Sequence, residues 1–297
     1  MKAPNTSNPT AGRFWSLGLI GWPLTFSLSP PIHEAALRQN GIKGEYRLFP
    51  VEPGPELETD LKALVERVRS GDLAGLNVTI PHKEAVPGLL DGLTPLAAEI
   101  GAVNTLFMER GRVMGDNTDA DGFMADLLRW AGELGRSWEE GTRVLMLGAG
   151  GASRAAAYAM CRAGWEVALA ARRIEQADDL VRWLRERKLK GPARAIAFDA
   201  AGLRGERPDL VVNTTPLGMG DQAGKSPWPT EVHFPAGAAV YDMIYYPRET
   251  LLVRDAKQAG LAATGGLGML IEQGALAFTR WTGCPVERKD LWRACGY

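Results

Sequence analysis

A glycine-rich turn between a strand-like and a helix-like segment has the clearest chemical meaning in this chain. Residues 148–154 read GAGGASR, directly after the apolar segment 143–147 (RVLML) and at the start of a helix predicted over residues 153–163. Gly148 allows a tight turn, Gly150 lets the main chain approach a pyrophosphate, and the helix N-terminus offers N–H groups to that anion. In this context the motif favours a dinucleotide site over a purely structural turn. The residues predicted to line the site are Gly148, Ala149, Gly150, Gly151, Ala152 and Arg154.

The end of the next strand-like segment indicates which dinucleotide to expect. Residues 165–170 (WEVALA) are followed by Ala171, Arg172 and Arg173, which we add to the predicted site. NAD-dependent enzymes usually place an acidic residue here to bind the ribose 2′-hydroxyl, whereas guanidinium groups suit a 2′-phosphate. We therefore predict NADP, with Arg172 as the leading phosphate ligand and Arg154 as a second. A nearby glutamate keeps NAD as an alternative, and a solvated basic loop is the structural alternative.

Two serines could bind a carboxylate near the N-terminal end of the chain. Ser27 and Ser29 follow a strand predicted over residues 14–21. If this segment is extended, both hydroxyls point to the same side and can donate to one carboxylate. Ser29 also precedes Pro30 as an N-cap precedes the first residue of a helix, so the pattern alone leaves both interpretations open.

A lysine stands in an unusual place further along. Asn77 and Thr79 share one face of a strand predicted over residues 73–80, and Lys83 falls in the first turn of a helix predicted from Pro81. A positive charge in a first helical turn opposes the helix dipole. The sequence therefore marks Lys83 as a candidate for chemistry.

Alternating strand-like and helix-like segments must position these residues. In the first part we predict strands at residues 14–21, 45–51 and 73–80, helices at 30–40 and 56–70, and a hairpin over 102–116 that turns at Arg110–Gly111. In the second part we predict helices at residues 119–135, 153–163 and 175–188 and strands at 143–147, 165–170, 209–213 and 238–244. This order predicts an α/β protein of two domains, one with a mainly parallel sheet and one a Rossmann-type, doubly wound nucleotide-binding domain.

Composition excludes several other classes of protein. The chain has 297 residues, which suits two domains, and 34 basic against 35 acidic residues give a net charge of -1. This balance offers no electrostatic footprint for nucleic acid or an anionic membrane, and no apolar run is long enough to span a bilayer. The polar segment Met1–Thr10 lacks the features of a signal peptide, so we expect a frayed tail and a cytoplasmic protein.

Cysteine and histidine give no sign of a metal site or of disulfides. The three cysteines have no metal-ligand spacing, the three histidines are scattered, and we predict no metal. One histidine lies beside Lys83 and is the one of interest. These residues are Cys161, Cys284, Cys295, His33, His82 and His233.

Eight short segments in order resemble one enzyme family. They are SLSP, NVTIPHKE, GAVNT, GDNTDADG, GAGGASR, NTTPLGM, YDMIYYP and GLGMLIEQG, and they run from residue 27 to about residue 274. The chain is similar in these segments to the shikimate dehydrogenase family. The resemblance implies reversible reduction of 3-dehydroshikimate by NADPH, a step of aromatic amino acid biosynthesis.

The resemblance also implies roles for individual residues. Lys83 and Asp119 would be the catalytic pair, which moves the proton that accompanies hydride transfer. The substrate would be bound by Ser27 and Ser29 at its carboxylate and by Thr79, Asn104, Tyr245 and Gln273 at its carboxylate end or ring hydroxyls. Thr214, Met243 and Gly266 would contact the cofactor. The segment before SLSP departs from the family pattern, since Leu24-Thr25-Phe26 stands where the family often has a glycine or alanine and a histidine.

The resemblance implies a discontinuous arrangement of domains. Residues 1–118 with 266–297 would form the substrate domain and residues 119–265 the NADP domain, with the substrate in a cleft between them. We expect a monomer or homodimer. The alternatives are an NAD-dependent or dual-specificity quinate/shikimate dehydrogenase and a non-catalytic ligand-binding paralogue. A methylenetetrahydrofolate dehydrogenase has a similar architecture, but the paired serines disfavour it.

Overall fold

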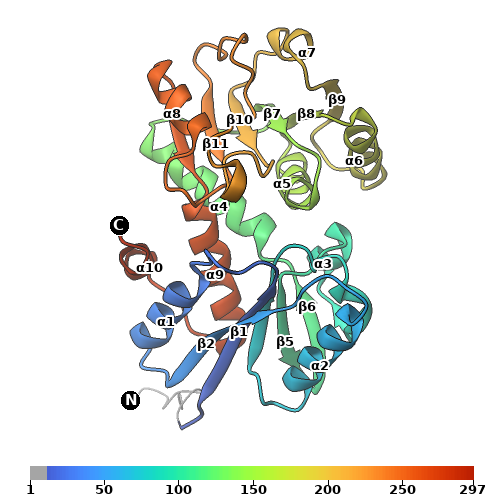
Figure 1. The fold of residues 1–297 in the computed structure, drawn as a ribbon, viewed down its shortest axis with the longest axis vertical. Coiled ribbons are helices and arrows are strands. Elements are labelled where there is room, and N and C mark those ends of the chain that lie inside the picture. Colours follow the sequence, from blue (N-terminus) through green and yellow to red (C-terminus); the bar gives the residue numbers. More distant parts are fainter. Residues whose placement is uncertain (1–11) are drawn as a thin grey trace, which may run out of the picture. The chain divides into compact units, whose positions relative to one another are not determined.

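Two six-stranded sheets carry the fold among the residues that the structure describes. The structure is a computed structural model, and it describes residues 12–297; the predicted frayed tail, residues 1–10, lies outside this range. The described residues up to Thr118 form one compact unit together with Ile271–Tyr297, and Asp119–Leu270 form a second (Figure 1).

The sheet of the first unit is mixed. Its order is β2-β1-β3-β5-β6-β4, and β5 alone runs against the other five described strands. The predicted hairpin is confirmed, because β5 and β6 pair and turn at Arg110 and Gly111 with φ of 51° and 77°. Positive φ at both central residues is what a two-residue hairpin turn requires. The strands are β1 (Trp15–Gly21), β2 (Gly44–Pro50), β3 (Gly75–Val78), β4 (Gly92–Leu93), β5 (Thr105–Glu109) and β6 (Arg112–Asp116).

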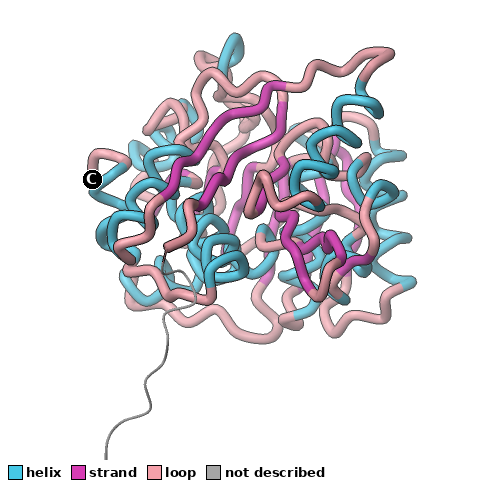
Figure 2. Tube along the Cα trace, turned by 90° about the horizontal axis from the view of Figure 1, so that it is seen from below, coloured by secondary structure: helices cyan, strands magenta, loops and turns pink. Residues whose placement is uncertain are grey.

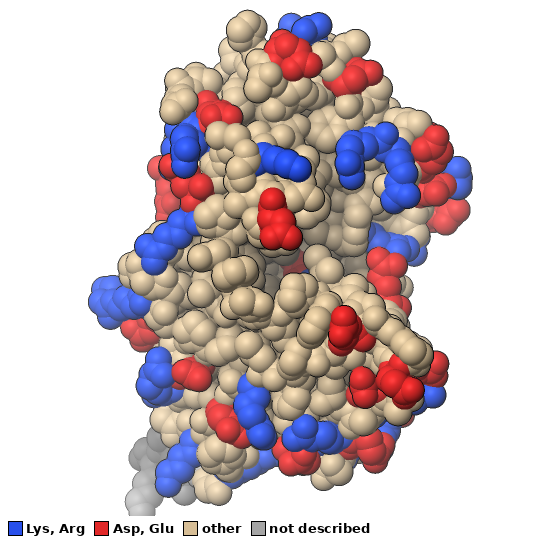
Figure 3. Space-filling model, viewed as in Figure 1, with Lys and Arg blue, Asp and Glu red and all other residues tan. Residues whose placement is uncertain are grey.

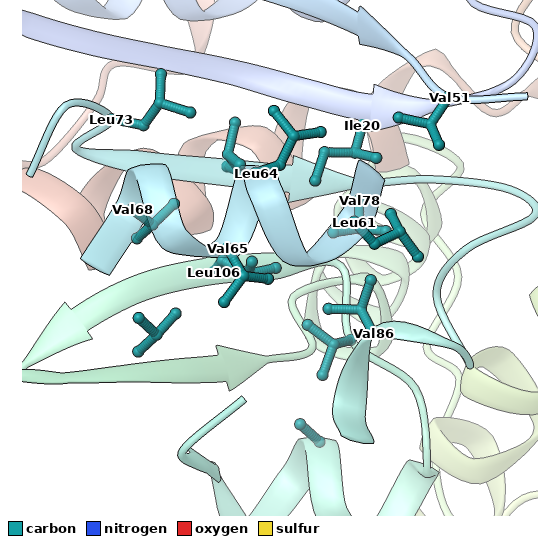
Figure 4. Packing of buried hydrophobic residues seen from close by; sticks show 14 residues of the cluster. Ile20, Val51, Leu61, Leu64, Val65, Val68, Leu73, Val78, Val86 and Leu106 are labelled. Carbon is teal, nitrogen blue, oxygen red and sulfur yellow. The ribbon is translucent and has the colours of Figure 1, made fainter. Parts of the chain in front are cut away.

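Helix α2 shows how the sequence builds the core of this unit. Leu61, Leu64, Val65 and Val68 recur at helical spacing, are buried, and pack with strand residues such as Leu106 (Figure 4). Each such side chain contributes roughly 1.5–3 kcal/mol by leaving water. The helices of the unit are α1 (Ser29–Gln39), α2 (Leu57–Arg69), α3 (Pro95–Ile100), α10 (Arg288–Ala294) and, from Ile271 onward, α9 (Leu267–Thr282).

The sheet of the second unit is parallel throughout. Its order is β12-β11-β10-β7-β8-β9, which is the doubly wound order, and helices accompany the strands (Figure 2). The strand order reverses between β7 and β10, and ligands of such sheets bind beyond the carboxyl ends of the strands at this point. The strands are β7 (Arg143–Leu147), β8 (Glu166–Ala171), β9 (Ala193–Ala197), β10 (Leu210–Asn213), β11 (Ala239–Asp242) and β12 (Ala262–Gly265), and the helices are α4 (Asp119–Glu133), α5 (Gly151–Arg162), α6 (Ile174–Glu186), α7 (Ala200–Arg204) and α8 (Leu251–Gln258).

The helix predicted from Pro81 is wrong. Residues 80–85 form turns, and a short 3-10 helix, η1 (Val86–Leu89), follows. Pro87 lacks the N–H that an α-helix needs and disfavours helical backbone at the residue before it, so the segment cannot continue as an α-helix. Lys83 therefore does not oppose a helix dipole.

Charges are mixed over the surface. On the face that Figure 3 shows, described basic and acidic side chains are interspersed. None of the described helices has the length and apolar character to cross a bilayer. Within residues 12–297, no group of three or more histidine, cysteine or acidic side chains is arranged to hold a metal ion.

Candidate functional site

The glycine turn after β7 is held by a short relay of hydrogen bonds. Thr214 donates to the Leu147 carbonyl oxygen through its N–H (2.9 Å) and through Oγ1 (2.8 Å). Thr214 Oγ1 therefore accepts from Ser153 Oγ at 2.6 Å, and Ser153 Oγ accepts the Gly150 N–H at 3.0 Å. Ser153, which stands where the dinucleotide pattern has its third glycine, thus ties the turn to the end of β10.

Two glycines of this turn differ in what a side chain would meet. Gly148 has φ +111°, and a Cβ there would lie 2.6 Å from Thr214 Oγ1. At Gly150 a Cβ would meet nothing within 4 Å, so the main chain faces open space there. The first N–H groups of α5 have no partner within the helix. An exposed turn, open space and a helix N-terminus together fit a pyrophosphate.

Arg172 and Arg173 follow the last residue of β8, the strand beside β7. Both are exposed, and neither side chain forms a hydrogen bond or an ion pair with any residue from 12 to 297. Two guanidinium groups without an acidic partner beside a glycine turn fit the 2′-phosphate of NADP.

The Arg154 side chain packs against a tryptophan of α6. Its guanidinium stacks over the Trp183 ring, 4.4 Å from the ring centroid, and Arg187 lies over the same ring at 3.8 Å. Trp183 is nine residues beyond the first residue of α6, which places it roughly 13 Å along the helix axis from the Arg172 end. Arg154 therefore packs α5 against α6, and this leaves Arg172 as the stronger candidate for the phosphate.

The ends of β11 and β12 bring two further predicted cofactor contacts together. A Cβ on Gly266 would lie 2.3 Å from the Met243 carbonyl oxygen, so only glycine fits there. The Gly266 N–H donates to the Ile244 oxygen (3.0 Å), and the Met243 N–H donates to the Asn213 oxygen (3.0 Å). Thr214, Met243 and Gly266 each follow the carboxyl end of a strand of one parallel sheet, as the glycine turn and Arg172 do.

A buried aspartate that the sequence reasoning missed orders this edge of the sheet. Asp242 ends β11 and accepts hydrogen bonds from Asn213 Nδ2 (2.8 Å), Thr250 Oγ1 (2.6 Å) and the Ile244 N–H (3.1 Å). Burial raises the pKa of Asp242 to about 6. Tyr245 follows three residues later, half-buried, and burial raises its pKa as well. Asp242 and Asn213 close their strands in YDMIYYP and NTTPLGM, which is the signal that could have identified them.

In the first unit, Asn104 and Gln273 lie together as predicted ligands of one substrate. The Thr118 N–H donates to Asn104 Oδ1 (2.8 Å), which fixes the orientation of the Asn104 amide. Asn104 Nδ2 then donates to Thr118 Oγ1 (2.9 Å) and to Gln273 Oε1 (3.3 Å). All three side chains are buried.

Asn77 and Thr105 extend this network and were not among the predicted site residues. Asn77 Nδ2 donates to the Asn104 carbonyl oxygen and to Thr105 Oγ1, both at 3.2 Å. Thr105 Oγ1 donates to Asn104 Oδ1 at 2.9 Å. Asn77 lies on β3 and Thr105 opens β5, so a strand pairing brings them together. Polar residues on adjacent central strands were the available signal.

Ser27 and Ser29 are not in an extended segment. Ser29 is the first residue of α1 and is buried, while Leu28 before it has φ −92° and ψ 5°. Pro30 suits a first helical turn because its φ is already helical and it has no N–H to satisfy. The Ser29 N–H donates to Ser27 Oγ at 3.3 Å, so the Ser27 hydroxyl proton can still point to an anion. Thr79 follows β3, the parallel neighbour of β1, and its N–H donates to the Ile20 oxygen (2.8 Å).

The predicted catalytic pair comes from different units. Lys83 is half-buried, and its carbonyl oxygen accepts the Val103 N–H at 2.8 Å, one residue before Asn104. Asp119 is the buried first residue of α4 and directly follows Thr118, which Asn104 holds. The main chains beside both residues are therefore tied to the Asn104 network.

The histidine beside Lys83 has a structural role. His82 is buried, and its Nε2–H donates to the Val51 carbonyl oxygen at 2.7 Å. Because a carbonyl only accepts, this bond fixes the tautomer and turns the ring into the core.

Comparisons with known proteins match both ends of the chain to models of one family. Residues 19–106 match the shikimate dehydrogenase substrate binding domain, and residues 266–295 match the shikimate 5′-dehydrogenase C-terminal domain.

Individual relatives cover most of the chain. The shikimate dehydrogenase (NADP(+)) of Salinibacter ruber is 42% identical and covers 89% of this chain and 90% of its own length. A crystal structure of shikimate 5-dehydrogenase from Thermus thermophilus, in complex with NADP(H) and shikimate, has a TM-score of 0.80 and 36% identity, over 94% of this chain and 98% of that one. A quinate dehydrogenase from Corynebacterium glutamicum in complex with NAD has a TM-score of 0.83 and 29% identity, over 95% and 99%.

Proposed function

The chain belongs to the shikimate dehydrogenase family, and from this premise we propose that it catalyses the reversible reduction of 3-dehydroshikimate to shikimate with NADPH. The observation that carries the proposal is the 42% identity over 89% of the chain to an enzyme of that name. The two guanidinium groups after β8, which have no hydrogen-bond or ion-pair partner among the described residues, support NADP as the cofactor. This reaction is a step of aromatic amino acid biosynthesis.

The residues of the first unit would bind the substrate. We propose that Ser27 and Ser29 donate hydrogen bonds to its carboxylate with help from Thr79. Asn104 and Gln273 already contact each other and would hold ring hydroxyls. Tyr245 of the second unit would complete this set.

Lys83 and Asp119 would carry out the proton transfer that accompanies hydride transfer. Reducing a ketone requires a proton at its oxygen as hydride reaches its carbon. The Lys83 ammonium would give that proton, and in the reverse direction its amine would take the proton from the shikimate hydroxyl. The Asp119 carboxylate would keep the lysine oriented. Such general acid–base catalysis is worth about 10²–10⁴ in rate.

The second unit would hold the cofactor, which supplies the hydride when bound. We propose that the turn Gly148–Ala152 receives its pyrophosphate and that Arg172, with Arg173, receives its 2′-phosphate. Thr214, Met243 and Gly266 would line the nicotinamide side. The first unit would thus be the substrate domain and the second unit, Asp119–Leu270, the NADP domain, so that the boundary predicted at residue 266 would lie after Leu270 instead.

A four-way activity assay tests this proposal. Shikimate and quinate are each offered with NADP and with NAD, and the absorbance of the reduced nicotinamide is followed. We expect turnover with shikimate and NADP to exceed the other three combinations. If shikimate turned over equally fast with NAD and with NADP, the assignment of NADP as the cofactor would be contradicted. If quinate turned over and shikimate did not, the assignment of shikimate as the substrate would be contradicted.

A variant of the proposed acid tests the mechanism. Lys83→Ala should lower kcat by about 10²–10⁴ while shikimate still binds, because the proton donor is lost and most binding groups remain. Lys62→Ala, on the exposed face of α2, is the matched control and should leave kcat unchanged. A loss confined to KM would reduce Lys83 to a binding role.

The proposal includes the surroundings of the enzyme. None of the three cysteines, all of which lie among the described residues, forms a disulfide, which fits a reducing compartment such as the cytoplasm. The balanced charge supports a small-molecule substrate in place of nucleic acid, and we expect a monomer or homodimer, which sedimentation would distinguish.

A further inference from the structure

A tyrosine on β2 adjoins the network that holds the proposed substrate ligands. Tyr46 is buried, and its hydroxyl donates to Asn77 Oδ1 at 2.8 Å. The direction of this bond is fixed, because Asn77 Nδ2 donates to the Asn104 carbonyl oxygen, which can only accept. Asn77 therefore presents its oxygen to Tyr46, and Tyr46 must be the donor.

From Asn77 the hydrogen bonds continue to the proposed ligands without a gap. Asn77 Nδ2 also donates to Thr105 Oγ1, Thr105 donates to Asn104 Oδ1, and Asn104 donates to Gln273. Each amide in this series has one orientation that satisfies its neighbours. The Thr118 N–H also holds Asn104, and the series that begins at Tyr46 supports Asn104, and through it Gln273, from the other side.

The ring of Tyr46 is itself held against α1. His33 stacks on it with ring centroids 4.3 Å apart and an interplanar angle of 3°. Burial lowers the pKa of His33 to about 3, so the stacked imidazole is neutral. His33 lies one helical turn after Ser29, on the same face of α1. Burial raises the pKa of Tyr46, and the nearby Ser29 hydroxyl acts in the opposite direction, so the phenol stays protonated and remains a donor.

We propose that Tyr46 is a positioning residue for the substrate, acting through Asn77 and Thr105 on Asn104 and Gln273. This inference rests on the proposed function of that site. Without the Tyr46 hydroxyl, the buried Asn77 Oδ1 loses its 2.8 Å hydrogen bond, and the Asn77 amide is held only through its Nδ2 contacts and is free to shift. The substrate then has to order the network when it binds. Removing the Tyr46 hydroxyl should therefore weaken substrate binding and leave kcat nearly unchanged, because Tyr46 delivers no proton to the reacting oxygen.

The variant Tyr46→Phe tests this role, with Tyr241→Phe as the matched control. Tyr241 also donates a buried hydrogen bond, to Asp126 Oδ2 at 2.6 Å, but within the second unit. For Tyr46→Phe we expect KM and the calorimetric Kd for shikimate to rise about tenfold, with kcat and the Kd for NADP within about twofold of the wild type. Tyr241→Phe should lose stability and keep the wild-type KM. An unchanged KM in Tyr46→Phe would overturn the proposal, since a structural role alone lowers only stability.

A second variant keeps the test decisive if Tyr46→Phe does not fold. Thr105→Val removes the next hydroxyl in the series with little change of shape, and it should raise KM in the same sense. The double variant should show less than the sum of the two effects, because both break one series. An unchanged KM in Thr105→Val, or full additivity, would overturn the proposal. If the wild type neither oxidises nor binds shikimate, the proposed function fails as well; an active wild type with unaffected variants refutes the role of Tyr46 alone.

Discussion

Replacing Asp242 by asparagine should change the stability of the protein in a pH-dependent way. Burial raises the pKa of this carboxyl from 3.8 to about 6 in the folded protein. Folding therefore favours the protonated form, so the carboxyl stabilises the fold fully below pH 3.8 and loses this contribution as the pH rises through 6. A shift of about two pKa units corresponds to about 3 kcal/mol. Asparagine does not titrate, so its contribution to stability does not depend on pH.

The measurement compares wild type and Asp242→Asn by denaturant unfolding at several pH values. Between about pH 4.5 and 7.5 the difference in unfolding free energy should move by roughly 2 kcal/mol in favour of the variant, which is most of the full term over that window. The lost acceptor toward Thr250 adds an offset that does not depend on pH. Asp209→Asn is the control, because the hydrogen bond with Arg143 lowers the pKa of Asp209. Between about pH 4.5 and 7.5 the difference in unfolding free energy should therefore not move in favour of Asp209→Asn. A difference that stays flat across this pH window would refute the reasoning.

Three further substitutions probe the cofactor site and the core of the second unit. Gly148→Ala places a side chain at φ +111° and should weaken NADP binding at least about tenfold in a fluorescence titration, since such strain costs about 1–3 kcal/mol; unchanged affinity would contradict the role of the turn. Arg172→Ala should raise the Kd for NADP about 10- to 100-fold and leave the Kd for NAD nearly constant. Arg182→Ala, which removes an exposed and paired arginine of α6, is the control and should leave both Kd values unchanged. Equal losses of affinity for both cofactors in Arg172→Ala would count against a phosphate contact. Gly268→Ala would bring a Cβ within 1.9 Å of Asp126 Oδ1 and should destabilise the protein by about 1–3 kcal/mol in calorimetry, whereas a wild-type Tm would show that the carboxylate moves aside freely.

Local patterns predicted the parts of the fold that depend on local physics. The sequence predicts β7 at residues 143–147, because four of the five residues in RVLML are apolar and a glycine cluster follows them, and these bounds agree with the structure. The sequence likewise predicts α2 and the Arg110–Gly111 turn, because the helical spacing of apolar residues and the positive φ of a turn are each set by a few residues close together in the chain. Short elements such as β4 and α7 have too few residues to show a period and were not predicted.

Side-chain directions could not be read in the same way. Arg154 is predicted at a phosphate, and the sequence gives no sign that its guanidinium also stacks over the indole ring of Trp183, far along the chain. His82 stands beside Lys83 in sequence and turns instead to the carbonyl of Val51, which directly follows β2. The Asn77–Asn104 hydrogen bonds and the Asn213–Asp242 pair likewise depend on which strands become neighbours. Such partners are decided by topology, which periodicity does not encode.

The two units differ in when they can be completed during synthesis. The second unit is one uninterrupted stretch, Asp119–Leu270, so it is free to fold while the ribosome is still adding residues. The first unit has to wait for the last part of the chain, because the Trp281 indole donates to the Leu106 oxygen (2.8 Å) and fills the space beside Gly75. A nascent chain paused before residue 271 therefore leaves Gly75 on β3 and the Leu106 carbonyl on β5 without the indole ring that contacts them in the folded protein.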